Sequence, residues 1–259
     1  MIKLGVCTDI SNIKKVASAG FDYLEGNLTK LQAMTDGEFE STVDLVSALP
    51  IKVEACNCLI PGSIKLTGPE VNAQMIHDYL DSAFARAEIL GTKVVVFGSG
   101  AARRVPDGFD TAQAWRQIGN FLRLAERHAA QHDITIAIEP LRSGECNILN
   151  YVSEATAVAS LIQMPHIAVL GDTYHMAMGG EPFSALKMAG GLLKHVHVAN
   201  AIGRKYPKIG DGEKYQELFE TLNSIPYEGR VSVEGGCDDF DTDVVEAFKA
   251  LDAARSANA

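Results

Sequence analysis

"ITIAIE", residues 134–139, is the stretch from which we predict the fold. Three isoleucines alternate with Thr135, Ala137 and Glu139. A period of two is typical of a β-strand, and the face of branched residues suits contact with a layer of helices. The other face then points inward, so we expect Glu139 to point inward at the carboxyl end of this strand.

Seven other short runs, rich in residues that favour β-structure, are also predicted to be strands. They are KLGVC (3–7), YLEG (23–26), KVEAC (52–56), KVVVF (93–97), IAVLGD (167–172), HVHVA (195–199) and RVSVE (230–234). Helical patterns such as residues 72–91 and 111–132 lie between them, with apolar residues recurring at three and four. Eight strand-and-helix units in about 250 residues predict an α/β fold, a single (β/α)8 TIM barrel.

An open, doubly wound sheet is the alternative architecture. It is disfavoured because no G-x-G-x-x-G, the pattern of a dinucleotide-binding sheet, follows the first strand, where GVCTDIS stands instead. No linker rich in Pro, Gly or Ser interrupts the chain, so we expect one domain over residues 1–259.

The composition limits the partners of this chain. Its 33 acidic and 23 basic residues give a net charge of −10, which disfavours nucleic acid and anionic membranes as partners. The start of the chain lacks the pattern of a secretory signal, and no run approaches the roughly 18 apolar residues of a membrane span. We therefore expect a cytoplasmic protein whose five scattered cysteines are reduced.

Polar residues end four successive predicted strands. The alternation that turns Glu139 inward also turns Asp172, His197 and Glu234 inward, while His195 lies one layer deeper. Three carboxylates and a histidine in one barrel mouth predict a site for one divalent metal ion, Mn²⁺, Co²⁺ or Mg²⁺. The alternative is that each carboxylate caps the next helix or pairs with a surface lysine.

The motifs IEPLRSGE, GDTYH, HVHVAN and VSVEGG resemble those of the xylose isomerase-like barrels, and within them the D-tagatose 3-epimerase and D-psicose (allulose) 3-epimerase group. The resemblance implies that Glu139, Asp172, His197 and Glu234 bind the metal. It also implies that Glu139 and Glu234 are the catalytic acid/base pair. Carried over in the same way, the substrate-binding residues are Glu145, His175 and Arg204, although Arg204 lies one residue farther from His197 than the family pattern.

The function that the resemblance implies is metal-dependent isomerisation or epimerisation of a keto-sugar or sugar derivative through an enediolate. A dehydratase or lyase of the inosose dehydratase type, acting on an oxidised sugar or cyclitol, is the alternative. A sugar sensor is disfavoured, because it would not need two opposed bases. We expect the protein to be a homodimer or homotetramer.

Two loops bear on the substrate. After the fourth strand, Arg103 and Arg104 are candidates to meet an anionic group on the substrate, with a solvated loop as the alternative. After the third strand, Glu54, Asn57 and Lys65 are candidate lining residues. We favour a neutral sugar, since the resemblance is to epimerases of free sugars.

Overall fold

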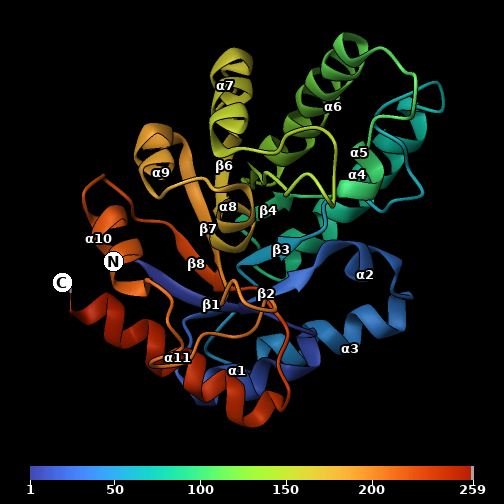
Figure 1. The fold of residues 1–259 in the computed structure, drawn as a ribbon. Coiled ribbons are helices and arrows are strands. Elements are labelled where there is room, and N and C mark those ends of the chain that lie inside the picture. The colour runs from blue at the N-terminus through green and yellow to red at the C-terminus, as the bar shows by residue number, and fades with distance from the viewer. Residues whose placement is uncertain (258–259) are drawn as a thin grey trace.

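Eight parallel strands pair in sequence order and close into a barrel (Figure 1). The computed structural model describes residues 1–257, so the last two residues of the predicted domain lie outside the described part. The strands are β1 (Lys3–Cys7), β2 (Tyr23–Asn27), β3 (Ala55–Asn57), β4 (Val94–Phe97), β5 (Thr135–Ile138), β6 (Ile167–Asp172), β7 (Leu193–Val198) and β8 (Arg230–Val233). The predicted TIM barrel is confirmed.

Helices surround the barrel on its outside, as Figure 1 shows. They are α1 (Ile13–Ala19), α2 (Leu28–Ala33), α3 (Asp36–Ser47), α4 (Ala73–Ile89), α5 (Gly100–Arg103), α6 (Thr111–Gln131), α7 (Val152–Ile162), α8 (Thr173–Gly179), α9 (Ser184–Ala189), α10 (Tyr215–Asn223) and α11 (Phe240–Ser256), with short 3₁₀ turns η1 (Ile10–Asn12) and η2 (Gly190–Leu192). The two longest predicted helical patterns correspond to α4 and α6. Each begins after a side-chain cap, Asn72 for α4 and Asp110 for α6.

The alternation along the strands divides the apolar residues into two clusters. The isoleucines of β5 and the valines of β7 join the large cluster between barrel and helices. The small cluster fills the barrel interior and comprises Tyr23, Ala55, Val94, Val96, Ala137 and Leu170. Gly5 makes room for the ring of Tyr23, since a Cβ at this position would lie 2.3 Å from the ring. The predicted inward direction of Ala137 is thus confirmed.

The third strand is shorter than predicted and begins at Ala55. Glu54, a candidate lining residue, lies at the amino end of the barrel, away from the strand ends where we expect the site. Its carboxylate accepts hydrogen bonds from Lys3 Nζ at 2.7 Å and from Arg230 Nη2 at 2.7 Å. The prediction for Glu54 was therefore wrong: the pattern predicted a strand over residues 52–56, whereas the observed strand begins after Glu54.

No helix in residues 1–257 combines the length and apolar character that a membrane span requires.

We predict that Glu54→Gln lowers the free energy of unfolding at pH 7 by about 1–2 kcal/mol. Burial opposes the charged form of Glu54, but the hydrogen bonds from Lys3 and Arg230 outweigh it and hold the pKa of this carboxyl below its ordinary value. A depressed pKa in the folded state stabilises the fold above the unfolded-state pKa of about 4.3, and this contribution is lost as the pH falls through the folded pKa.

Urea unfolding of both proteins at pH 7 and pH 3.5 measures the effect. The difference should shrink at the lower pH. An equal difference at both values would contradict the assigned role of the charge.

Candidate metal centre and active site

Four polar side chains meet at the carboxyl ends of neighbouring strands. Glu139 follows β5, Asp172 ends β6, His197 lies in β7 and Glu234 follows β8. One nitrogen or oxygen atom from each lies within 4.8 Å of one from every other. Glu139, Asp172 and His197 are buried, and Glu234 is partly exposed. The structure therefore brings together all four residues that the sequence predicted to share a site.

His197 Nδ1 lies at the centre of this group. It is 3.2 Å from Glu139 Oε1, 3.2 Å from Glu234 Oε2 and 3.8 Å from Asp172 Oδ2. Three carboxylates and one imidazole nitrogen converging on one small volume form a ligand set that suits a divalent cation. The donor set therefore fits the predicted metal ion.

The charges in the cluster affect one another strongly. Burial, followed by the negative charges of Glu139 and Glu234, raises the pKa of Asp172. Burial also opposes ionisation of Glu234, but its contacts with His197 and Arg204 outweigh burial and lower the pKa of Glu234. The carboxylates therefore compete for positive charge, and a bound cation would relieve their repulsion.

Arg204 reaches the cluster from the loop after β7. Its Nη2 lies 2.6 Å from Glu234 Oε2 and 3.5 Å from Asp172 Oδ2, and its guanidinium stacks over the ring of Tyr174 at 4.9 Å. The backbone of Arg204 is in the left-handed region, with φ of 50°. The loop thus turns sharply at Arg204, and the side chain reaches the site although its spacing from His197 is one residue longer than the family pattern.

Glu145 and His175 lie on the same side of the cluster as Arg204. Glu145 Oε2 is 3.9 Å from Arg204 Nη1 and 3.9 Å from His175 Nε2. The backbone N–H of Arg142 donates to His175 Nδ1 at 3.2 Å, so a neutral His175 carries its proton on Nε2, which faces Glu145 and Asp172. The three predicted substrate-binding side chains therefore lie together beside the predicted metal ligands.

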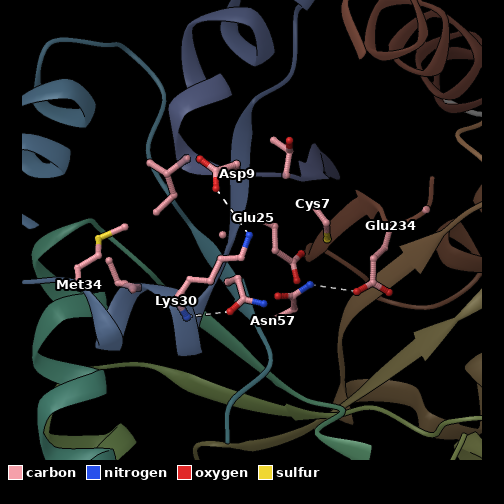
Figure 2. A pocket seen from close by; sticks show the side chains of 13 residues that line it. Cys7, Asp9, Glu25, Lys30, Met34, Asn57 and Glu234 are labelled. Atoms are coloured by element: carbon pink, nitrogen blue, oxygen red, sulfur yellow. Dashed lines mark hydrogen bonds and ion pairs between the residues drawn. The ribbon is translucent and has the colours of Figure 1, made fainter. Parts of the chain in front are cut away.

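A cavity of about 300 Å³ opens beside Glu234, over the ends of β1, β2 and β3. Figure 2 shows Glu234, Asn57, Cys7 and Glu25 at one end of it and Asp9 and Lys30 at the other. Asn57 Nδ2 donates to Glu234 Oε1 at 3.1 Å, so the predicted lining role of Asn57 agrees with its position. The lining is rich in polar groups, as a hydroxyl-bearing ligand requires.

The other loop candidates lie elsewhere. Arg103 is fully buried, and its guanidinium donates to the carbonyl oxygens of Phe97 and Glu139, each at 2.8 Å. Arg103 cannot meet a substrate anion, so that hypothesis was wrong. Its hydrogen bonds instead link the end of β4 to the backbone of Glu139. Arg104 and Lys65 line a separate groove.

Glu25 of β2 is the site residue that the sequence analysis missed. Its carboxylate is completely buried between His195 Nε2 at 2.7 Å and His197 Nε2 at 2.9 Å. His195 therefore lies beneath His197, as predicted. Strand alternation could have predicted it, because Glu25 lies two residues after Tyr23 on the same strand and therefore points to the same, inward side.

The sequence model of the xylose isomerase-like TIM barrel family matches residues 13–256. The chain belongs to this family. Among curated relatives, it is 28% identical over 121 residues to 3-dehydro-D-guloside 4-epimerase of Escherichia coli (strain K12), covering 46% of this chain and 45% of the relative. It is 29% identical over 113 residues to ketose 3-epimerase of Arthrobacter globiformis, covering 43% of this chain and 38% of the relative. The matched stretch thus spans less than half the length of either relative.

Solved structures of the family have the same fold. A 3-keto-D-glucoside 4-epimerase from E. coli, in its apo form, superposes with a TM-score of 0.83 at 19% identity, covering 98% of this chain and 100% of that one. D-psicose 3-epimerase solved in the presence of D-fructose gives 0.81 at 18% identity, covering 98% of this chain and 97% of that one. At such identities the likeness establishes the fold alone.

We predict that the protein binds one equivalent of Mn²⁺ and that Asp172→Asn abolishes this binding. Saturation at 100 times Kd should stabilise the fold by about 2.7 kcal/mol, an increase that a chelator reverses. Asp172 Oδ1 accepts a hydrogen bond from the backbone N–H of His175 at the start of α8. Asparagine keeps this side-chain oxygen, so the variant should fold.

Isothermal titration with Mn²⁺ and thermal unfolding with and without chelator measure both effects. Asp133→Asn is the matched control, because this exposed carboxylate pairs only with Lys93 among the ion pairs found in residues 1–257. Unchanged Mn²⁺ binding by Asp172→Asn would refute the predicted ligand set.

Proposed function

We propose that this protein is a divalent-metal-dependent epimerase or isomerase of a keto-sugar or sugar derivative, with Glu139, Asp172, His197 and Glu234 as metal ligands. The observation that carries the proposal is the placement of Glu139 and Glu234. They come from β5 and β8, and each lies 3.2 Å from the same His197 Nδ1. Two carboxylates can therefore flank one substrate from different sides of the barrel mouth.

Epimerisation next to a ketone needs this arrangement. One carboxylate takes the proton from the carbon beside the carbonyl, and the carboxylic acid on the other side returns a proton to the opposite face of the enediolate. The number of protons on the two carboxyl groups is unchanged after the reaction. A bound divalent ion would supply positive charge to the carbonyl oxygen and its neighbouring hydroxyl.

The residues around this pair have complementary roles in the proposal. Arg204 and His175 donate hydrogen bonds to substrate oxygens, and Glu145 accepts them from substrate hydroxyls. The guanidinium of Arg204 offers several donors in one plane, which suits neighbouring oxygens of a sugar. The stack of Arg204 on Tyr174 limits its motion and orients those donors.

The names of the curated relatives support a sugar substrate. One relative is named a 3-dehydro-D-guloside 4-epimerase and another a ketose 3-epimerase, so both names describe inversion of a carbon in a keto-sugar. The removal of Arg103 as a candidate for an anionic group favours a neutral substrate. We infer that one barrel domain carries out the whole reaction.

The test is product analysis by NMR in deuterated water, with a panel of ketoses, keto-glycosides, phosphorylated sugars and inosose-type ketones. The proposal predicts an epimer or isomer of at least one neutral keto-sugar, with the position of inversion read from the product. Deuterium should enter at the inverted carbon whenever the base exchanges with solvent. Loss of a hydroxyl group would instead show the dehydratase alternative.

We predict that Glu139→Gln and Glu234→Gln each reduce turnover by about 10²–10⁴, because an amide cannot accept the proton. Metal content must be measured beside the rate, since both carboxylates belong to the predicted ligand set. Glu54→Gln is the control for the same chemical change at the far end of the barrel and should retain full turnover. Normal turnover of a metal-replete Glu234→Gln protein would exclude Glu234 from the reaction.

A further inference from the structure

A carboxylate without contact to solvent lies directly below the predicted metal site. Glu25 is completely buried, as are His195 and His197. Glu25 Oε1 lies 2.9 Å from His197 Nε2, and Glu25 Oε2 lies 2.7 Å from His195 Nε2. Within residues 1–257 these two histidines are its ion-pair partners, and no lysine or arginine pairs with it. Figure 2 shows Glu25 close to Cys7, Asn57 and Glu234 at one end of the cavity.

The chemistry of the contact fixes the direction of the hydrogen bond. An ionised carboxylate only accepts, so His197 must donate from Nε2, and a neutral imidazole then has an unprotonated Nδ1. Nδ1 is the atom that faces Glu139 and Glu234, at 3.2 Å from each. Glu25 thus selects the tautomer whose free lone pair points into the predicted ligand set.

His195 holds the second oxygen of Glu25. Its Nδ1 is buried without a hydrogen-bond partner in the described part of the chain, which is tolerable for a lone pair but costly for an N–H donor. His195 therefore carries its proton on Nε2, and this N–H donates a hydrogen bond to Glu25. Behind it, Ser232 Oγ lies 3.5 Å from His195 Nε2 and 2.6 Å from the hydroxyl of Tyr23. With both oxygens held, the Glu25 carboxylate cannot rotate away from His197.

Packing of the barrel interior does not explain why position 25 holds a carboxylate. Taking a charge out of water is unfavourable, and the interior residue paired with Glu25 on the next strand is the apolar Ala55. An apolar residue at position 25 would fill the barrel but would leave Nε2 of both histidines without an acceptor. The cost of burial is consistent with a task that only an acceptor at this position performs.

We propose that Glu25 is a positioning residue that acts through His197. It keeps the proton of His197 on Nε2 and thereby presents Nδ1 to the divalent ion. The inference rests on the metal site of the proposed function. Acceptors that orient a metal-bound histidine in this way typically change metal affinity 10–100-fold when they are replaced.

The first test is Mn²⁺ affinity, measured by isothermal titration of Glu25→Gln with the metal alone. Glutamine keeps the shape but offers one acceptor and one donor group, so it cannot accept from both histidines. We expect Mn²⁺ to bind 10–100-fold more weakly than to the unaltered protein. Glu54→Gln makes the same chemical change at a carboxylate far from the site and should bind Mn²⁺ like the unaltered protein.

The second test needs no variant at position 25 and applies even if Glu25→Gln fails to fold. Nitrogen-15 NMR of histidine side chains in the Zn²⁺-loaded protein distinguishes the two ring nitrogens, and the His197 signals are those that His197→Asn removes. We expect the proton on Nε2 and the metal on Nδ1. In folded Glu25→Gln, the His197 signals should show a mixture of tautomers.

Unchanged Mn²⁺ affinity in Glu25→Gln, or a Zn²⁺-bound His197 with its proton on Nδ1, overturns the inference and leaves the metal site intact. Failure of the unaltered protein to bind either metal overturns the metal site itself, and the inference with it. A loss of thermal stability with unchanged affinity would mean that Glu25 serves only the fold.

Discussion

Repulsion among three carboxylates held around one imidazole nitrogen is the constraint on which the rest of this structure depends. Glu139, Asp172 and Glu234 cannot all remain charged in a buried volume without positive charge close by. The chain supplies one part of that charge from Arg204, which contacts two of the three. A divalent cation at His197 Nδ1 would supply the rest, and this requirement links the barrel, the loops and the proposed chemistry.

The closed barrel determines where this charge accumulates. Strand pairing places His197 beside Asp172 on one side and beside Ser232 on the other, so inward residues of neighbouring strands form layers. His195 and Glu25 lie one layer below the mouth, where Tyr23 and Ser232 continue the polar contacts into the interior. The polar column beneath the site is therefore a direct result of strand alternation in a barrel.

Much of this arrangement was predictable, because two simple rules act together. Alternation gives the inward side of a strand, and the carboxyl-end rule gives the height, so Glu139, Asp172, His197 and Glu234 follow from sequence alone. The positions of Glu145, His175 and Arg204 do not, since loops have no period; they came from family motifs. Their catalytic and binding roles stay predictions.

The misses have physical reasons as well. Glu25 follows the same alternation, but it lies on an early strand without a family motif. Only the closed barrel brings its side chain on β2 to the histidines of β7, across the barrel interior. Arg103 was a candidate to meet an anionic substrate group because arginines in loops are usually exposed to solvent, whereas its buried guanidinium binds backbone carbonyls. Glu54 was misplaced because β3 begins later than its apolar pattern indicates.

Diffraction from crystals grown with Mn²⁺, recorded for the anomalous signal of manganese, tests the central claim most directly. The account predicts one strong peak in the barrel mouth, about 2.0–2.6 Å from an atom of each of Glu139, Asp172, His197 and Glu234. A mouth without a peak at saturating Mn²⁺, or a peak whose ligands exclude His197, would contradict it.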